Sequence, residues 1–134
     1  MSSHNGFPVL TADEAAALVH HGATVAFSGF TPAGAAKAVP RALARRAHDY
    51  HEMGEPYSLR VISGASTGAI DEGLALERAI SWRTPYHSSK ALRACLNAGE
   101  IEFVDMHLSH VPQAMAFGFL GKIDFAIVEC TAAE

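Results

Sequence analysis

Residues 24–37 read TVAFSGFTPAGAAK, which is a short apolar run, a glycine-containing loop and the start of an alanine-rich stretch. Residues 24–27 have the length and the apolar character of a short buried strand. The alanine-rich residues after the loop favour a helix, because alanine has the highest helix propensity. A strand followed by a helix across a glycine loop is typical of one unit of a parallel sheet.

The same order of strand and helix recurs along the chain. Thr11 and Glu14 have the pattern of a capping box and predict a helix over residues 11–20. Pro40 is expected to interrupt the alanine-rich stretch, giving a short helical turn and then a longer helix that begins near Pro40. The other predicted elements are helices over residues 71–81, from Ser88 or Ser89 to Ala98 and over residues 112–120, an irregular segment at 83–89, and strands at 24–27, 59–62, 101–104 and 123–128.

Alternating strands and helices predict an α/β fold with an open, mainly parallel sheet and flanking helices. The 134 residues have the length of one domain, and we expect one α/β domain over residues 1–134 with flexible residues 1–10. The sequence stops just after a predicted strand, whereas a parallel sheet needs helices on both faces. We therefore expect this domain to be the N-terminal piece of a longer, truncated protein.

The composition argues against several classes of protein. Apolar residues make up 49% of the chain and charged residues 18%, which is typical of a well-buried globular protein. The net charge of −4 argues against a nucleic-acid partner, and Arg41, Arg45 and Arg46 are interpreted as one solvated helix face. The sequence lacks the features of a signal peptide or a membrane span, so we expect no membrane partner. Cys95 and Cys130 stand apart, which suits a reduced, cytoplasmic location.

Glycine, hydroxyl, histidine and acidic residues gather after the predicted strands. They lie in four segments, which are residues 29–34, residues 64–68, residues 105–113 and Glu129. Ligands of open parallel sheets bind beyond the carboxyl ends of the strands, and these ends share one edge. The four segments together therefore predict a binding site at that edge.

The first segment has the glycine spacing of a phosphate-binding loop, with Gly29 and Gly34 five residues apart. A Walker A loop continues with Lys and then Ser or Thr, which bind the outer phosphates and Mg²⁺. Here Ala35 and Ala36 follow the second glycine, and Pro32 removes one backbone donor. We therefore expect no nucleotide, and expect the glycines to let the backbone approach another ligand.

The second segment, GASTG at residues 64–68, matches the Gly-x-Ser-x-Gly nucleophile elbow of serine hydrolases. Asp105 and then His107 or His110 follow in the required order. However, Asp105 and His107 are almost adjacent, whereas an acid and a base of this kind usually come from separate loops. Two other interpretations stay open, namely a tight turn capped by hydroxyl side chains and a loop that contacts substrate.

Histidines and Glu129 have structural as well as chemical interpretations. His107 and His110 are one residue short of the His-x-x-x-His zinc spacing, so we expect hydrogen-bonding histidines and no metal site. Glu129 is either a general base or, as we favour, a carboxylate paired at a strand end. The histidines at predicted helix C-termini are interpreted as structural, and these are His20, His21, His48 and His51.

Four motifs in fixed order resemble the N-terminal part of the acetyl-CoA hydrolase/transferase family, and within it the succinyl-CoA:acetate CoA-transferase type. The resemblance runs from Thr11 to Glu129 and implies a class I CoA-transferase, in which two related open α/β domains enclose the active site. The motifs are SGFTPAG with KAVP (residues 28–34 and 37–40), SGASTGAIDEG (63–73), DMHLSHVPQ (105–113) and GFLGKID (118–124).

The resemblance also implies a reaction. Enzymes of this family move CoA from an acyl-CoA to a free carboxylate. A glutamate attacks the thioester, passes through an acyl anhydride and becomes a glutamyl-CoA thioester, and the incoming carboxylate reverses the sequence. We therefore expect exchange of CoA between a short acyl-CoA (acetyl-CoA or succinyl-CoA) and succinate or acetate, without a metal or an organic cofactor. The alternatives are an acetyl-CoA hydrolase of the same family and a non-catalytic α/β binding module.

The nucleophilic glutamate of the family lies in the second domain, so the resemblance implies no catalytic residue in this chain. Glu129 does not match the motif of the nucleophile. The chain alone is expected to be inactive and to form one wall of a crevice with the C-terminal domain of the same protein, and a homo-oligomer is left open. Ser66 would contact the substrate carboxylate or the acyl group, with a hydroxyl that can donate to a carboxylate oxygen, and the glycine loop would offer backbone N–H groups to the acyl oxygens. The implied substrate-binding residues are Gly29, Phe30, Thr31, Pro32, Ala33, Gly34, Ser66, Thr67 and His110.

Overall fold

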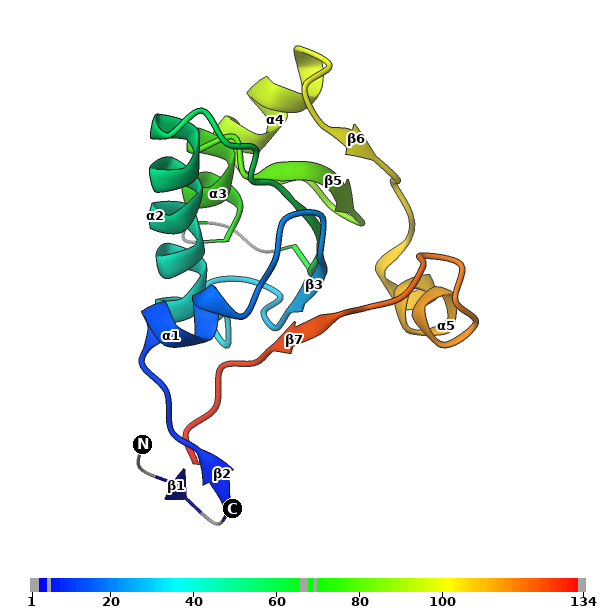
Figure 1. Cartoon of the computed structure of the whole chain (residues 1–134). Coiled ribbons are helices and arrows are strands. Elements are labelled where there is room, and N and C mark those ends of the chain that lie inside the picture. Colours follow the sequence, from blue (N-terminus) through cyan, green and yellow to red (C-terminus); the bar gives the residue numbers. More distant parts are fainter. Residues whose placement is uncertain (1–2, 5, 66–67, 69, 133–134) are drawn as a thin grey trace.

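The structure, a computed structural model, describes residues 3–4, 6–65, 68 and 70–132. Its main sheet has five strands in the order β6-β5-β4-β3-β7, and every neighbouring pair is parallel (Figure 1). The predicted α/β class with an open parallel sheet is therefore confirmed. The strands are β3 (Thr24–Phe27), β4 (Leu59–Ile62), β5 (Ile80–Thr84), β6 (Glu102–Phe103) and β7 (Phe125–Ile127).

Most helices cover one face of this sheet. They are α1 (Ala12–Ala17), α2 (Ala38–Glu52), α3 (Asp71–Leu76) and α4 (Lys90–Asn97). Each packs against the next along the chain, and Figure 1 shows them together on one side of the strands.

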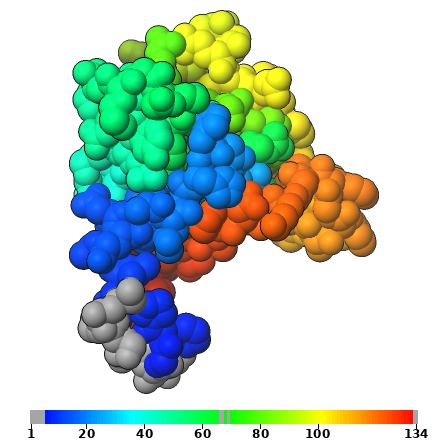
Figure 2. All heavy atoms as spheres, viewed as in Figure 1, coloured from blue at the N-terminus to red at the C-terminus, as the bar shows by residue number. Residues whose placement is uncertain are grey.

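The opposite face is covered by a single short helix of the described chain. This helix is α5 (Val111–Ala116), which follows the 3-10 turn η1 (Leu108–His110). It lies away from the other helices and, in orange, projects from the body of the molecule in Figure 2. A separate antiparallel pair, β1 (Ser3–His4) with β2 (Phe7–Pro8), precedes the main sheet.

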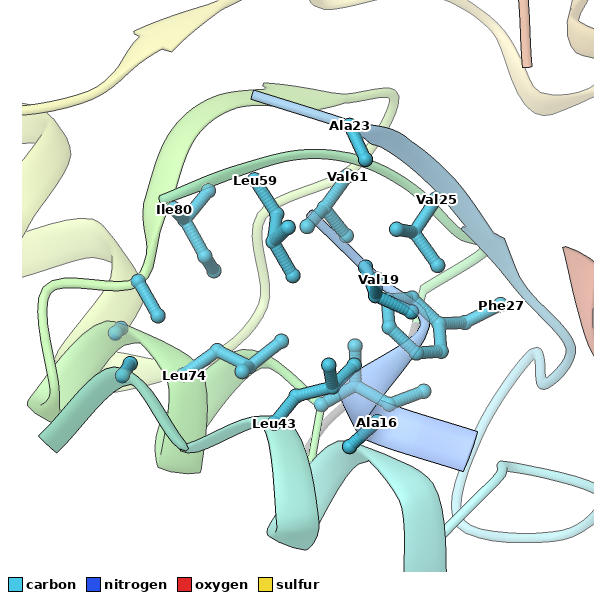
Figure 3. Close-up of a cluster of buried hydrophobic side chains, with 14 of the residues drawn as sticks. Ala16, Val19, Ala23, Val25, Phe27, Leu43, Leu59, Val61, Leu74 and Ile80 are labelled. Atoms are coloured by element: carbon cyan, nitrogen blue, oxygen red, sulfur yellow. The ribbon is translucent and has the colours of Figure 1, made fainter. Parts of the chain in front are cut away.

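The main core lies between the sheet and helices α1 to α4. Val25, Leu59 and Val61 point from the strands toward Leu43 and Leu74 on the helices (Figure 3). All five side chains have no exposed surface. Burial of apolar surface on this face therefore fixes the layer of helices against the sheet.

A smaller cluster covers part of the opposite face. Ile62 of β4, Trp82 of β5 and Leu120 are buried together, and Val111 and Met115 of α5 pack against them. The sheet thus buries apolar side chains on both faces, as parallel sheets do.

Several boundaries predicted from sequence are confirmed. β3 and β4 have the predicted bounds. The capping box is present at the start of α1, because the backbone N–H of Glu14 donates to Thr11 Oγ1 (3.2 Å) and the Thr11 N–H donates to Glu14 Oε2 (2.7 Å). Ser89 caps α4, and Gly99 follows that helix with a left-handed φ of +73°.

The predicted interruption before Pro40 is wrong. α2 is one helix from Ala38 to Glu52, and Pro40 lies in its first turn. The N–H groups of a first turn have no partner within the helix, so a proline there removes no hydrogen bond.

The predicted helix over residues 71–81 begins at Asp71 as expected but ends at Leu76, and the predicted irregular segment at 83–89 is irregular only from residue 85. Both predictions missed β5, which occupies residues 80–84. α3 ends at Leu76 in a Schellman motif. Arg78 takes a left-handed φ of +53°, and the N–H of Ala79 donates to the carbonyl of Leu74 (2.8 Å). The chain then enters the sheet instead of continuing as a helix.

A bulge in β5 explains why sequence periodicity does not reveal this strand. Leu59 pairs with Ile80 and Arg60 pairs with Trp82, which leaves Ser81 as an extra residue on β5. Ile80 therefore packs in the helix-side core, and Trp82 packs in the cluster on the opposite face. The alternation that marks a regular strand is lost at this point.

Other predicted elements are present but shorter. The predicted strands at 101–104 and 123–128 are β6 and β7, and the predicted helix at 112–120 is α5, which ends at Ala116. The flexibility of residues 1–10 stays a prediction. None of the helices in the described parts of the chain combines the length and apolar character that crossing a bilayer requires.

Candidate functional site

The carboxyl ends of all five parallel strands share one edge of the sheet. β4, β3 and β7 are neighbours, so the glycine loop after β3 lies between the segments that follow β4 and β7. Because β5 is a strand, residues 85–89 form a fifth segment at this edge that sequence reasoning missed. Loops of this kind are where open parallel sheets bind ligands.

The loop after β3 is exposed in its middle and fixed at its ends. Phe30–Gly34 is exposed, whereas Ala35 and Ala36 are buried. Ser28 Oγ donates to the carbonyl of Gly34 (2.8 Å) and accepts from the backbone N–H of Glu129 (2.8 Å). One hydroxyl therefore closes the loop and joins it to the end of β7.

Gly29 is required at the start of this loop. Its φ is +121°, a conformation that L side chains rarely adopt. A Cβ atom at this position would lie 2.6 Å from the Cα of Ala35. The glycine therefore allows the backbones at the two ends of the loop to lie in direct contact.

The loops after β3 and β4 are also in backbone contact. A Cβ atom on Gly64 would lie 2.7 Å from the carbonyl oxygen of Gly29 and 3.3 Å from the Cα of Phe30. Two segments predicted to share an edge are thus brought together directly. The predicted Ser66 and Thr67 lie outside the described residues, and their roles stay predictions.

On its other side the loop meets a charged pair. Lys37 Nζ lies 3.1 Å from Glu129 Oε1 and donates to the carbonyl of Ala35 (2.9 Å). The interpretation of Glu129 as a paired carboxylate is confirmed. Both side chains are nearly half exposed, at 48% and 43%, so the pair adds little stability.

Ser63, at the end of β4, is a further residue that sequence reasoning missed. The residue is 5% exposed, and its Oγ has no hydrogen-bond partner among the described residues. A buried hydroxyl without a partner costs free energy. No sequence signal separates Ser63 from the other hydroxyl residues of this stretch.

The predicted His110 lies on η1 and is exposed. Its ring is 5.7 Å from the ring of His107, whose Nδ1 accepts from the backbone N–H of Ser109 (3.3 Å). Within the described residues, no hydrogen bond or ring contact joins His110 to the glycine loop, so its role stays a prediction. His107 is a hydrogen-bonding histidine, as expected.

A hollow of about 450 Å³ opens beside these histidines. It is lined by Tyr86 from the segment after β5 and by Asp105, Met106, His107 and Leu108 from the segment after β6. Tyr86 belongs to the missed fifth segment, so the sequence did not place it at this edge. One signal could have revealed the strand before Tyr86: two predicted helices followed each other there with no strand between them, whereas βαβ units alternate strands and helices.

Two titratable groups next to the edge strands have shifted pKa values. Burial lowers the pKa of His87, whose ring packs edge-on against Phe103 with ring centres 5.2 Å apart. The backbone N–H of Thr24 donates to Asp124 Oδ2 (3.0 Å) and lowers the pKa of that carboxyl. The two shifts favour the neutral form of His87 and the charged form of Asp124.

The other histidines have structural contacts. The backbone N–H of Ser58 donates to His21 Nδ1 (2.9 Å), and His48 Nδ1 lies 3.1 Å from Glu77 Oε2. A larger hollow of about 820 Å³ lies beside α1 and α2, away from the carboxyl edge. In the described ranges, no three His, Cys, Asp or Glu side chains are placed to hold a metal ion.

The edge is chemically suited to a negatively charged oxygen. A loop fixed at both ends holds its backbone N–H groups in place, and such preorganised donors stabilise developing negative charge. At Gly29 and Gly64 no side chain separates the two loops where they meet. Glu129 is paired with Lys37 beside this loop.

Comparisons with known proteins agree with this geometry. Residues 7–134 match the model of the acetyl-CoA hydrolase/transferase N-terminal domain. The chain is 50% identical to propanoyl-CoA:succinate CoA transferase of Escherichia coli K12 and 40% identical to succinyl-CoA:acetate CoA-transferase of Clostridium kluyveri. It is 37% identical to acetyl-CoA hydrolase of Eremothecium gossypii. Each similarity covers 92% of this chain but 25%, 23% and 25% of the respective relative, so the chain spans about a quarter of their length.

Proposed function

This chain belongs to the acetyl-CoA hydrolase/transferase family as its N-terminal domain, and on that basis we propose that it forms one wall of the active site of a CoA-transferase. The parent enzyme would move CoA between a short acyl-CoA and a carboxylate such as succinate or acetate. The family match and the identities to two named CoA-transferases support this activity.

The reaction balances without an external oxidant or reductant. A glutamate outside these 134 residues attacks the acyl-CoA carbonyl, and CoA leaves as a thiolate. CoA then attacks the glutamyl carbonyl of the resulting anhydride, which releases the first carboxylate and leaves a glutamyl-CoA thioester. Succinate reverses these steps and leaves as succinyl-CoA. We propose that no metal or organic cofactor takes part, since the glutamate carries the covalent chemistry.

The role of this chain in that reaction is to hold and orient the acyl group. The single observation that carries this role is the backbone contact between Gly29 and Gly64, which joins two loops at the carboxyl edge. We propose that the backbone N–H groups of residues 29–34, apart from Pro32, stabilise the negative charge that develops on the acyl oxygens. Ser66, Thr67 and His110 are proposed to contact the substrate from the neighbouring segments.

A hydrolase of the same family is the second candidate. It is supported by the 37% identity to acetyl-CoA hydrolase of Eremothecium gossypii. The identity of 50% to propanoyl-CoA:succinate CoA transferase favours transfer. In the transferase a carboxylate takes CoA from the glutamyl thioester, whereas in the hydrolase water takes the acyl group and CoA is released free.

The setting of the enzyme is part of the proposal. Cys95 is half-buried and Cys130 is exposed, and both are free thiols. Free thiols suit a reducing compartment, so we propose a cytoplasmic location. We also propose that the C-terminal domain of the same protein closes the crevice, because the named relatives are about four times as long as this chain.

The test is to supply propanoyl-CoA or acetyl-CoA to the protein that contains this domain, with and without succinate, and to separate the CoA esters. We expect succinyl-CoA to form only when succinate is present. Release of free CoA at a rate that succinate does not change would instead identify a hydrolase. Absence of both products would leave the non-catalytic module. The 134-residue chain assayed alone is the control, and we expect it to be inactive.

A further inference from the structure

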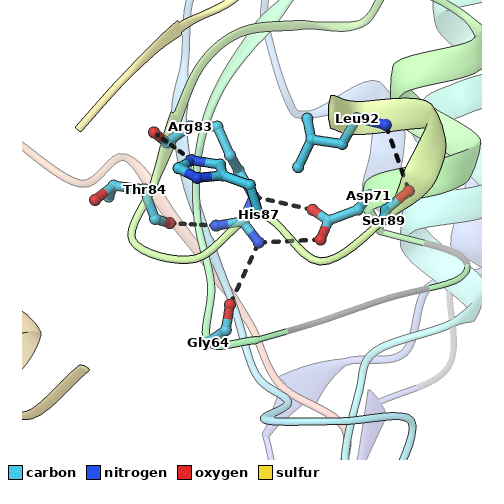
Figure 4. A network of polar contacts seen from close by, with 7 residues as sticks. All are labelled: Gly64, Asp71, Arg83, Thr84, His87, Ser89 and Leu92. Atoms are coloured by element: carbon cyan, nitrogen blue, oxygen red, sulfur yellow. Dashed lines mark hydrogen bonds and ion pairs between the residues drawn. The ribbon is translucent and has the colours of Figure 1, made fainter. Parts of the chain in front are cut away.

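Arg83 of β5 lies at the centre of a buried polar network (Figure 4). Its side chain and that of Asp71 have no exposed surface. Arg83 Nε donates to Asp71 Oδ1 (2.9 Å) and Nη2 donates to Oδ2 (3.2 Å), which is a bidentate ion pair. Nη1 donates to the carbonyl of Thr84, and Nη2 also reaches the carbonyl of Gly64 (3.4 Å).

Gly64 and Asp71, which are partners of Arg83, lie at the two ends of one segment of the chain. Gly64 is the second residue after β4, and Asp71 is the first residue of α3. The guanidinium therefore fixes the separation between the end of a strand and the start of the next helix. Because Gly64 also contacts the backbone of Gly29, the position of Gly64 affects the glycine loop as well.

The bulge at Ser81 is the reason that an arginine faces this interior. Arg83 pairs with Val61, whose side chain lies in the helix-side core, and it therefore faces the same layer as α3. In a regular strand Arg83 would lie on the same face of the sheet as Ser81 and on the face opposite to Ile80. The fold thus places one cation within reach of both ends of the segment at 64–71.

We propose that Arg83 is a positioning residue for the acyl and carboxylate site, which rests on the function proposed above. It holds Gly64 and Asp71 at a fixed separation and so sets where the loops after β3 and β4 meet. Arg83 does not contact the substrate. Its planar fork is needed because a lysine ammonium is a single point charge that pairs with Asp71 but lacks the geometry to reach Gly64 at the same time.

Two variants separate positioning from folding. Arg83→Lys keeps the buried charge beside Asp71. The double variant Arg83→Met/Asp71→Leu removes both charges, and replacing a whole buried pair by apolar residues commonly leaves a protein folded. The control is Tyr57→Phe, which removes the hydrogen bond from the Tyr57 hydroxyl to the carbonyl of Val19 (2.8 Å) at the opposite edge of the sheet.

The first measurement is amide hydrogen exchange in the protein that contains this domain. The N–H groups of Glu72 and Gly73 donate to the carbonyl of Gly68 (2.8 and 3.3 Å) and report on the segment that Arg83 bounds. We expect their exchange to accelerate by about tenfold or more in Arg83→Lys and in the double variant, and to change little in Tyr57→Phe. Unchanged exchange in both Arg83 variants would overturn the proposal.

The second measurement is steady-state kinetics with succinate. Misplaced backbone donors weaken binding of a charged substrate, so we expect KM for succinate to rise by about tenfold. A loss of folded protein lowers kcat alone and leaves KM unchanged. Accelerated exchange with an unchanged KM would therefore overturn the positioning role. If the wild-type protein transfers no CoA at all, the proposed function fails, and the exchange measurement still decides whether Arg83 fixes the segment.

Discussion

A methyl group on Gly64 would lie 2.7 Å from the carbonyl oxygen of Gly29, so these two glycines bring the loops after β4 and β3 into backbone contact. The contact is between main-chain atoms, and neither loop can relieve a clash by rotating a side chain. The geometry of the proposed site therefore depends on residues that carry no functional group.

Gly64→Ala is the first test of this contact. We expect the free energy of unfolding to fall by about 1–3 kcal/mol, because the added methyl group displaces backbone. We expect KM for succinate to rise in the same variant. Urea unfolding and steady-state kinetics check the two effects.

Gly73→Ala is the matched control. Gly73 lies in α3, and a Cβ atom there would meet nothing within 4 Å. We expect this change to stabilise the protein by about 0.5–1 kcal/mol, since alanine has the higher helix propensity. Equal changes in the free energy of unfolding and in KM for the two variants would contradict the close approach of Gly64 to Gly29.

Ser28 is predicted to matter more for stability than the charged pair beside it. Ser28→Ala removes the hydroxyl that donates to Gly34 and accepts from Glu129, and we expect a loss of about 1–2 kcal/mol. Lys37→Met breaks an exposed ion pair and a hydrogen bond to the carbonyl of Ala35, and is expected to cost about 0–1 kcal/mol. Urea unfolding of both variants checks this, and a larger effect of the lysine change would refute the assignment.

Ser63 and Thr84 give opposite predictions for the loss of a buried hydroxyl. Ser63 Oγ has no hydrogen-bond partner in the part of the chain that the structure describes, so Ser63→Ala is expected to stabilise the protein by about 1 kcal/mol. Thr84 Oγ1 donates to the carbonyl of Val104 (2.7 Å), so Thr84→Val is expected to destabilise it by about 1–2 kcal/mol. Thermal unfolding of both variants checks the signs, and destabilisation by Ser63→Ala would show that this hydroxyl has a partner.

Asp124 gives a prediction for pH. The N–H of Thr24 holds the pKa of this carboxyl below its ordinary value of 3.8 in the folded protein. A lowered folded pKa contributes stability that is fully present above the unfolded value and is lost as the pH falls through the folded value. We therefore expect Asp124→Asn to be less stable than the wild type at about pH 7 and the difference to shrink below about pH 3. Urea unfolding of both proteins at the two pH values tests this. A difference in stability that grows as the pH falls would contradict the lowered pKa of Asp124.

The fold was predictable where local pattern and tertiary structure agree. β3 and β4 are short apolar strands with regular pairing, and their bounds follow from the sequence. Ser89 and Gly99 mark the ends of α4 because capping is a local interaction. The parallel sheet was predicted, so the carboxyl edge could be predicted as the place of the site, and the loop at residues 29–34 as part of it.

The rest depends on contacts between distant parts of the chain. β5 was missed because the bulge at Ser81 breaks the alternation of apolar and polar residues along the strand. Without β5, the ion pair between Arg83 and Asp71 could not be predicted. The glycines at 29 and 64 signal unusual backbone geometry, but no local pattern shows that they face each other. The loop contact and the buried pair therefore required the three-dimensional structure.

The central claim is that the parent protein moves CoA to a carboxylate through a glutamyl intermediate, with this chain as one wall of the site. The most direct measurement uses succinate labelled with heavy oxygen in its carboxylates and follows the label into the carboxylate released from the acyl-CoA. Formation of succinyl-CoA leaves one labelled oxygen on the glutamate, and the next turnover passes it to the released carboxylate. We predict that propanoate or acetate carries oxygen from succinate. A product whose oxygen comes only from water would contradict the claim.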